Sequence, residues 1–175
     1  VLNSLAAVSL CLHIGIKMNI IKKSLKSFSG IQRRLTKVFQ IKEREFYDDY
    51  AHHPTEIKSV LKSLKITSNE RKIVSVFQPH RYSRLRLLNK DFSSSFKDSD
   101  LVILCPVYAA GEKIDRKYSP LDFAKSITRD SNVQVVLVNN QKDLKNFFIK
   151  NLIENEIVVC MGAGSISKWL REMKF

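Results

Sequence analysis

Short apolar runs and amphipathic segments take turns along residues 44–175. Continuous runs of Val, Ile and Leu are typical of strands that are covered on both faces. Apolar residues spaced three and four positions apart predict helices that pack one face on a sheet. The pattern predicts strands at 44–49, 72–78, 101–105, 133–138 and 157–161, and helices at 54–65, 84–96, 119–128, 141–150 and 164–174. Because each strand is followed by a helix, we expect an α/β fold with a doubly wound, mainly parallel, Rossmann-like sheet.

Residues 1–34 have the pattern of two amphipathic helices and a linker. The apolar positions of the first helix are Leu2, Leu5, Val8 and Leu12, and those of the second are Ile21, Leu25 and Phe28, with an end near Gly30. Two helices of this size cannot bury both apolar stripes by themselves, so we interpret them as the tail of a preceding domain. The basic, β-prone stretch 31–41 predicts a linker that enters the next domain as an edge strand. We therefore divide the chain into residues 1–34 and 35–175.

The chain has 175 residues and a formal net charge of +13, a balance that raises the question of a polyanionic partner. The lysines are spread over nearly every predicted helix, and no aromatic-and-arginine stacking motif accompanies them. We interpret them as solvated helix faces and expect no nucleic-acid partner. A free-standing anion-binding module with a basic surface is the alternative of a different class.

The cysteines and the apolar run at the start of the chain indicate the cellular compartment of the protein. Cys11, Cys105 and Cys160 lie in apolar runs and form no Cys-x-x-Cys pair, so we expect buried, reduced thiols of a cytoplasmic protein. The run 1–16 is too short to span a bilayer, contains polar residues and lacks a basic leader. We expect neither a membrane segment nor a signal peptide there. The start at Val rather than Met fits a piece of a longer protein.

The first stretch with candidate chemistry is 48–57, which reads Asp-Asp-Tyr-Ala-His-His-Pro-Thr-Glu-Ile. It joins the strand at 44–49 to the helix that Pro54 opens, and open α/β sheets bind ligands in that crevice. A helix cap or an ordinary polar turn would also use these residue types.

The second stretch is 78–84, which reads Gln-Pro-His-Arg-Tyr-Ser-Arg. Arg81 and Arg84 lie three apart at the predicted mouth of a helix, where two guanidinium groups and free N–H groups suit an anionic oxygen. The alternative is that both arginines pair with surface acids.

Two further loops and the histidines are less specific. Residues 106–113 follow the strand at 101–105, and we expect them to shape the crevice wall. Gly162-Ala163-Gly164-Ser165 predicts a tight turn with Ser165 as a helix cap, rather than a phosphate site. Adjacent histidines at 52 and 53 rarely face one ion, and His80 adds no suitable fourth-ligand spacing, so we expect no metal site.

Together these strings resemble the Mur ligases, and within that family its alanine-adding branch. The strings are Asp-Asp-Tyr-Ala-His-His-Pro-Thr-Glu, Gln-Pro-His-Arg-Tyr-Ser-Arg, Val-Tyr-Ala-Ala-Gly-Glu, and, in the first segment, Asn3-Ser4-Leu5-Ala6-Ala7 and Gly30-Ile31-Gln32-Arg33-Arg34-Leu35. The resemblance covers essentially the whole chain. It implies that 35–175 is the carboxy-terminal domain and that 1–34 ends the central ATPase domain.

The activity that the resemblance implies is ATP-dependent amide-bond formation between UDP-N-acetylmuramate and L-alanine in peptidoglycan precursor synthesis. ATP phosphorylates the lactyl carboxylate, and the amine then displaces phosphate. The cofactors would be ATP and Mg²⁺, but the phosphate loop and the metal ligands of the family are not among residues 1–175, so we expect these residues alone to be inactive. The alternative is the recycling branch, which attaches a preformed murein peptide; Tyr50 and the 78–84 string favour the alanine branch.

The resemblance also implies roles for single residues. It places Asn3, Arg34 and Asp49 on the nucleotide, with Asp49 against the ribose hydroxyls and Arg33 as a less favoured neighbour of Arg34.

On the reacting groups the resemblance implies that His52, Arg81 and Arg84 are catalytic. It implies that Tyr50, His80, Arg81 and Arg84 contact the substrates.

Overall fold

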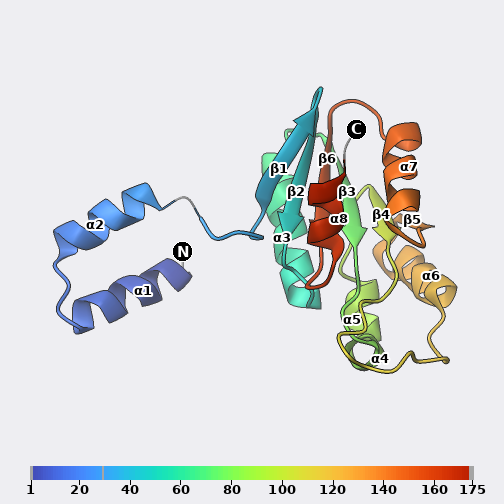
Figure 1. Ribbon diagram of the computed structural model, residues 1–175, viewed down its shortest axis with the longest axis horizontal. Helices are drawn as coiled ribbons and strands as arrows, with labels where there is room; N and C mark the ends of the chain where they lie inside the picture. Colours follow the sequence, from blue (N-terminus) through green and yellow to red (C-terminus); the bar gives the residue numbers. More distant parts are fainter. Residues whose placement is uncertain (1, 29, 174–175) are drawn as a thin grey trace. The chain divides into compact units, whose positions relative to one another are not determined.

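The structure is a computed structural model that describes residues 2–28 and 30–173 (Figure 1). The chain divides into two compact units, Val1–Ile31 and Gln32–Phe175. The division falls shortly before the boundary predicted after residue 34, so that Arg33 and Arg34 belong to the second unit.

The first unit is a pair of helices, α1 (Leu2–His13) and α2 (Met18–Ser27), as the apolar spacing predicts. Ile21 is buried on α2. Many of the other large apolar side chains of this unit stay exposed: Leu5, Leu10, Leu12, Ile14, Ile20, Leu25 and Phe28. Two helices therefore leave their apolar stripes largely uncovered, as expected for so small a unit. Among residues 2–28 and 30–173, no helix is long and apolar enough to cross a membrane.

The second unit is built on one six-stranded sheet in the order β1-β2-β6-β3-β4-β5. The strands are β1 (Thr36–Ile41), β2 (Arg44–Asp49), β3 (Lys72–Phe77), β4 (Leu101–Leu104), β5 (Gln134–Leu137) and β6 (Glu156–Met161). The edge strand β1 pairs antiparallel with β2, and the other neighbours pair parallel. The predicted doubly wound, mainly parallel sheet is confirmed.

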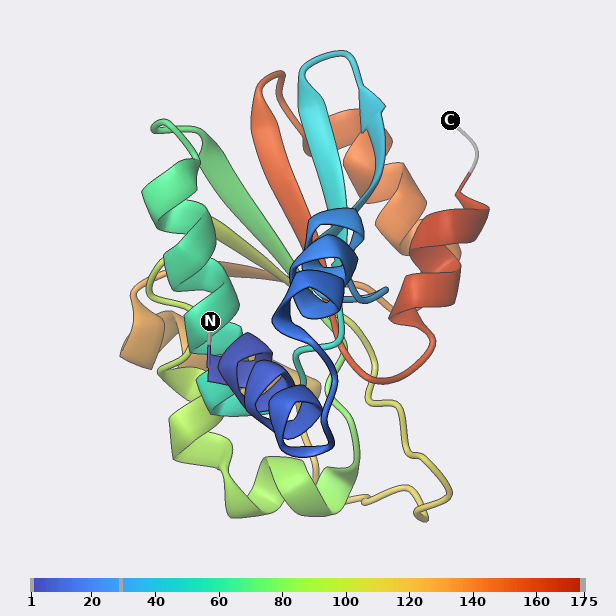
Figure 2. The same ribbon diagram turned by 90° about the vertical axis from the view of Figure 1, so that its left-hand side faces the viewer.

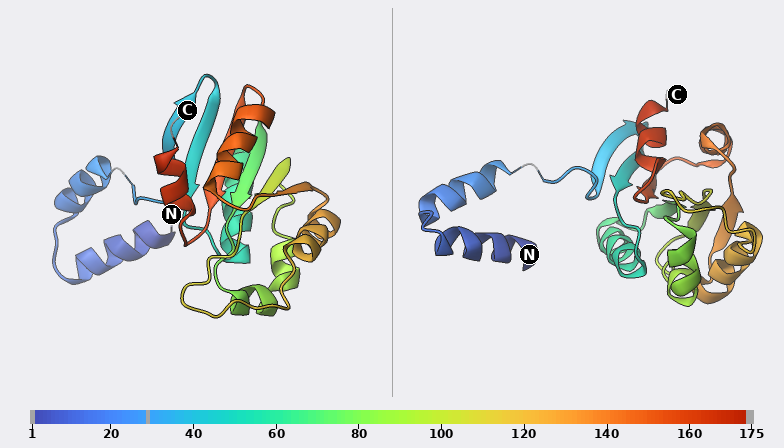
Figure 3. Two further views of the ribbon diagram at one scale, coloured as in Figure 1. Left: turned by 45° about the vertical axis from the view of Figure 1, so that its right-hand side comes forward. Right: turned by 60° about the horizontal axis from the view of Figure 1, so that its bottom comes forward.

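Helices cover both faces of the sheet (Figures 2 and 3). On one face lie α3 (Pro54–Thr67) and α6 (Pro120–Ser131), whose Leu61 and Ile127 are fully buried in one core cluster. On the other face lie α7 (Gln141–Asn151) and α8 (Ile166–Glu172), whose Phe148 and Leu170 are fully buried in a second cluster. Burial on both faces explains why the central strands are continuous apolar runs.

The predicted helix at 84–96 is wrong as a single element. The chain forms α4 (Tyr82–Leu87) and α5 (Asn89–Ser93), which are separated at Leu88. In the serine run that follows, the hydroxyls of Ser93, Ser94 and Ser95 bond to main-chain carbonyls three or four residues back. Such side-chain bonds compete with the helix ladder, which is why apolar spacing alone overestimated the length. The predicted helix at 164–174 also begins later, at Ile166, and residue 174 lies outside the described part of the chain.

The three cysteines are free thiols. Cys105 and Cys160 are buried, and burial raises the pKa of Cys105 to about 12 and that of Cys160 well above its usual value. Cys11 is only partly buried, so the expectation of three buried thiols is wrong for this residue. The short first unit has too little core to enclose it.

The strand order brings four loops together at the carboxyl edge of the sheet. The chain passes from β2 to β3 across one face and returns from β5 to β6 across the other, so that β6 lies between β2 and β3. The loops after β2, β3 and β6 are therefore neighbours, and the loop after β4 lies next to them. This is the place where open α/β sheets hold ligands.

Candidate functional site

The loop after β2 is fixed by a capping box at the start of α3. The carboxylate of Glu56 accepts hydrogen bonds from the main-chain N–H of His52 at 2.9 Å and of His53 at 3.1 Å. His53 is the N-cap residue, and its ring accepts from Thr55 N–H. Burial acts to raise the pKa of Glu56, but these N–H groups and the neighbouring charges outweigh it and lower the pKa. Local bonds thus hold the loop, and the His52 ring is part of them, because its Nδ1 lies 2.9 Å from the Tyr50 carbonyl and 3.5 Å from the Glu56 carboxylate.

Asp49 is a main-chain anchor at the end of β2. Its carboxylate accepts from the N–H of Leu35 and of Ala51, both at 2.7 Å, and the residue is 3% exposed. Burial raises the pKa of Asp49, and the two N–H bonds oppose that rise. Each carboxylate oxygen therefore already has a main-chain partner in the fold.

Asp48 is fully buried and joins three segments. Its Oδ2 accepts from Ser167 Oγ at 2.6 Å and from Arg171 at 3.0 Å, both on α8, and its Oδ1 lies 3.7 Å from Arg33 Nε. Arg33 also donates to the carbonyl of Gly162. A buried carboxylate with these partners ties β2, α8 and the 33–35 segment together.

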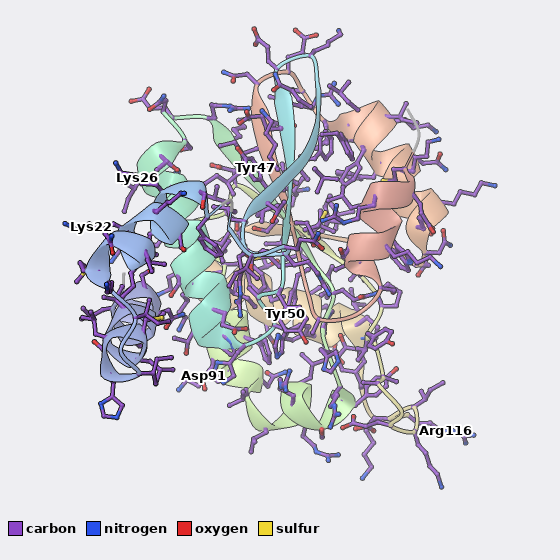
Figure 4. The ribbon with its side chains drawn as sticks, turned by 60° about the vertical axis from the view of Figure 1, so that its left-hand side comes forward. Lys22, Lys26, Tyr47, Tyr50, Asp91 and Arg116 are labelled. Carbon is purple, nitrogen blue, oxygen red and sulfur yellow. The ribbon has the colours of Figure 1, made fainter. Side chains whose placement is uncertain are left out.

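Tyr50 lies beyond Tyr47, past the carboxyl end of β2 (Figure 4). The guanidinium of Arg33 stacks on its ring at 4.8 Å, and that of Arg34 lies 5.9 Å from the ring centre. The side chain of Arg34 is 54% exposed and lies 3.9 Å from Glu56. Tyr50 and Arg34 therefore form one exposed aromatic and cationic surface.

The loop after β3 brings His80 to the β2 loop. The ring of His80 lies 5.7 Å from that of His52, which in turn lies 5.0 Å from that of Tyr50. Burial lowers the pKa of His80, and the neighbouring Arg84, His52 and Arg81 lower it further. His80 is therefore neutral near pH 7 and able to accept a hydrogen bond.

The main chain of Arg81 is held in a conformation that is rare for residues other than glycine, with φ 69° and ψ 133°. Its N–H donates to the carbonyl of Tyr108 at 2.9 Å. The Arg81 side chain is exposed, and that of Arg84 is partly buried. Strain of this kind costs about 1–3 kcal/mol and is concentrated at functional sites.

The predicted role of helix N–H groups at this loop needs a correction. Helix α4 has only six residues, and the carboxylate of Glu112 already lies at its start. Glu112 accepts from both the hydroxyl and the N–H of Ser83, and the Ser83 hydroxyl is the main cause that lowers the pKa of Glu112. The protein's own acid thus occupies the helix terminus, so positive charge for a ligand comes from the guanidinium groups.

The loop after β6 differs from the prediction in its cap. Ser165 is the N-cap residue of α8, but its side chain makes no cap bond. Instead the buried Gln78 accepts from Ile166 N–H and donates to Ser165 Oγ, both at 3.0 Å. A side chain on Gly162 would come within 2.8 Å of the Gln78 carbonyl oxygen. The tight turn that the two glycines predict is therefore present, and it lies against the β3 loop.

Asn3, the remaining predicted nucleotide residue, is an exposed residue of α1 in the first unit. The structure brings Tyr50, His52, His80, Arg34, Arg81 and Arg84 to one edge of the second unit, where Asp49 lies beneath them in the sheet. Across the described ranges, no cluster of three or more His, Cys, Asp or Glu is arranged to hold a metal ion.

Residues 33–164, which include this whole edge of the sheet, match the family described as Mur ligase, glutamate ligase domain. The chain belongs to the Mur ligase family. The resemblance carried by the sequence strings is thereby confirmed.

Among curated Mur ligases, the chain is 49% identical over 171 residues to the UDP-N-acetylmuramate–L-alanine ligase of Pelagibacter ubique (strain HTCC1062), with 98% of this chain and 37% of that protein covered. It is 42% identical to the ligase of the same name from Brachyspira hyodysenteriae (strain ATCC 49526 / WA1), with 95% of this chain and 36% of that protein covered. The chain thus spans little more than a third of the length of these relatives.

The fold matches solved Mur ligases. The crystal structure of UDP-N-acetylmuramate-alanine ligase from Thermotoga maritima superposes with a TM-score of 0.75 at 27% identity, over 97% of this chain and 35% of that one. A murein peptide ligase from Psychrobacter arcticus shares the fold with a TM-score of 0.69 at 18% identity, over 99% of this chain and 37% of that one.

Several residues of this candidate site were not singled out from the sequence. Glu56 lies three residues after His53, a capping-box spacing that could have revealed its task. Tyr108, Glu112 and Gln78 gave no such signal, because each acts on a loop that is distant in sequence. Arg33, the less favoured neighbour, proves to be the better anchored of the two arginines.

Proposed function

We propose that residues 1–175 form the carboxy-terminal part of a cytoplasmic UDP-N-acetylmuramate–L-alanine ligase, in which the unit at residues 1–31 ends the central ATPase domain and the unit at residues 32–175 is the last domain. The observation that carries this proposal is the meeting of His52 and His80, whose rings lie 5.7 Å apart on loops from two strands. Besides burial, the cationic side chains of Arg84 and Arg81 lower the pKa of His80, so both guanidinium groups lie close enough to act on its ring. Identities of 42–49% to alanine ligases support L-alanine as the amine.

The proposed reaction uses ATP to activate a carboxylate. The γ-phosphoryl group passes to the lactyl carboxylate of UDP-N-acetylmuramate, and ADP leaves. The amine of L-alanine attacks the acyl carbon, a C–N bond forms, the C–O bond to phosphate breaks, and the nitrogen loses a proton. Negative charge develops on oxygens in both steps, so positioned guanidinium groups stabilise them. This edge of the sheet would close over the nucleotide and exclude water from the acyl phosphate.

Arg81 and Arg84 supply the positive charge in this proposal. Their planar groups match carboxylate and phosphate oxygens. His52 holds its Nδ1 2.9 Å from the carbonyl of Tyr50, so Nε2 is the ring nitrogen that remains for a ligand. His80, neutral near pH 7, would accept a hydrogen bond from the amine of the incoming amino acid.

Of the residues predicted to bind the nucleotide, Arg34 is better placed to contact ATP than Asp49. Arg34 suits a phosphate oxygen or the base, because its side chain is 54% exposed and its guanidinium lies beside the Tyr50 ring. Asp49 suits the ribose less well, because both of its oxygens already accept main-chain bonds. We therefore propose that Asp49 acts mainly by holding the 33–35 segment in place. The part of the chain that the structure describes has no cluster of three or more His, Cys, Asp or Glu arranged to hold a metal ion, and we propose that the ligands of Mg²⁺ belong to other parts of the enzyme.

The proposal is tested by comparing residues 1–175 with the enzyme made from the full reading frame. We expect UDP-N-acetylmuramoyl-L-alanine from the full enzyme and none from residues 1–175 alone, since these contain no phosphate loop. Product formation by the 175 residues, free of contaminating ligase, would contradict this division of labour. Failure of the full enzyme to use L-alanine would contradict the proposed function itself.

A further inference from the structure

We infer that Gly164 is a positioning residue: its missing side chain lets the Tyr108 ring lie against the β6 loop, and Tyr108 in turn fixes His80 and Arg81. The inference deepens the proposed function, since it concerns the same site. The 106–113 loop, which we expected from the sequence only to shape the crevice wall, thereby has a defined role in positioning His80 and Arg81.

The contact between Gly164 and Tyr108 is closer than any side chain permits. A Cβ atom at residue 164 would lie 2.4 Å from Tyr108 Cγ, 2.6 Å from its Cβ and 2.6 Å from Gln78 Oε1. Gly164 has no left-handed φ, unlike Gly162 at 154°. Glycine is therefore required at 164 for the close approach of Tyr108, and not for the backbone conformation.

Tyr108 contacts the β3 loop in three ways. Its ring stacks on that of His80, with centroids 5.6 Å apart and an interplanar angle of 22°. Its carbonyl accepts from Arg81 N–H at 2.9 Å, and its N–H donates to the Pro79 carbonyl at 2.8 Å. The strained main chain of Arg81 is thus hydrogen-bonded directly to Tyr108, which lies close to the β6 loop because residue 164 is glycine.

A methyl group at residue 164 has an open direction in which to push the ring. The methyl would meet Tyr108 Cβ and Cγ and Gln78 Oε1, so the whole Tyr108 side chain, together with the Gln78 amide, must shift. Tyr108 is 41% exposed, so its side chain can move toward solvent. We therefore expect Gly164→Ala to fold and to uncover His80. Burial is the main cause that lowers the pKa of His80; Arg84, His52 and Arg81 lower it further, and the carboxylate of Glu112 raises it.

The first experiment is an NMR titration of the histidines in the 175-residue chain, which does not depend on ligase activity. In Gly164→Ala and in Tyr108→Ala the pKa of His80 should rise toward 6.5, its usual value. Ser165→Ala is the matched control: it removes the acceptor of Gln78 in the same loop, adds nothing near Tyr108, and should leave His80 unchanged. A His80 titration in both folded variants identical to that of the unaltered chain would overturn the inference.

The second experiment is a double-mutant cycle in the full-length ligase. Gly164→Ala should lower kcat by about tenfold or more, because small displacements of a catalytic group are costly, with little change in KM for ATP. In a Tyr108→Ala background the same change should have little further effect. Equal losses in both backgrounds would mean that Gly164 acts through Gln78 or stability, and would also overturn the inference. Inactivity of the unaltered full-length enzyme would instead contradict the proposed function.

Discussion

Arg171 of the last helix donates to the buried carboxylate of Asp48 at 3.0 Å, joining α8 to the strand that begins the site. The Asp48 side chain is fully buried, whereas that of Arg171 is 43% exposed. We expect Arg171→Ala to lower the free energy of unfolding by about 1–2 kcal/mol, less than a fully buried charged bond would cost because water screens the arginine. Urea denaturation of the 175-residue chain measures this. Lys168→Ala on the same helix, whose side chain is 73% exposed, should change stability little, and an equal loss in that control would contradict the special role of the pair.

Replacement of Asp49 by asparagine tests the anchor under the site. The carboxylate accepts two main-chain hydrogen bonds, and an amide can accept only one while its NH₂ group faces an N–H donor. We expect Asp49→Asn to cost about 1–3 kcal/mol of stability and to loosen the 33–35 segment. Thermal unfolding and amide hydrogen exchange at Leu35 measure the two effects. The exposed Asp91→Asn is the control, and unchanged exchange at Leu35 in Asp49→Asn would show that this anchor is not needed.

The pH dependence of stability follows from the lowered pKa of His80. The folded state holds this proton less tightly than the unfolded chain, so its contribution to stability is fully present above 6.5 and is lost as the pH falls through the lowered pKa. We expect His80→Gln to lose less stability than the unaltered chain between about pH 7.5 and about pH 5. The exposed His13→Gln on α1 should keep the original dependence. The same slope in His80→Gln as in the unaltered chain would show that His80 is not held in its neutral form.

Substitutions of Arg81 test whether the loop after β3 takes part in catalysis. In the full-length ligase we expect Arg81→Ala to reduce kcat by the equivalent of about 2–4 kcal/mol, since it removes a charged contact to the transition state. Arg81→Lys should recover little, because an ammonium group does not reproduce a planar, two-pronged contact. Lys62→Ala, on the exposed side of α3, should leave catalysis intact. Steady-state kinetics with each substrate varied measures the effect of all three substitutions. Near-normal turnover of Arg81→Ala would show that Arg81 has no catalytic role and only pairs with surface acids.

Much of the fold could be predicted from the sequence because local patterns determine it. The continuous apolar strands, the Pro54 and Pro120 helix starts and the alternation of strands with helices all agree with the structure. The broken α4–α5 segment could not be predicted from apolar spacing, because the competing bonds come from serine hydroxyls. Likewise, no local pattern indicates that the cap of α8 is supplied by Gln78, which lies on another loop.

The candidate site could be predicted where one loop contains several reactive or charged side chains close together in sequence. The sequence strings pointed to the β2 and β3 loops, and the strand order brings them together. The sequence could not indicate that Glu112 takes the start of α4, because that contact joins two loops. The burial of Asp49 under two main-chain bonds was equally hidden, since an acid at the end of a strand suits a ligand and an anchor alike.

The most direct test of the account is a hybrid ligase in which residues 1–175 replace the matching carboxy-terminal part of the 49% identical Pelagibacter ubique enzyme. The hybrid is supplied with ATP, UDP-N-acetylmuramate, and L-alanine together with a preformed murein peptide in competition. We expect UDP-N-acetylmuramoyl-L-alanine as the main product, and loss of that product in the Arg81→Ala hybrid. A folded hybrid that attaches the preformed peptide in preference to L-alanine, or that forms neither product, would contradict it.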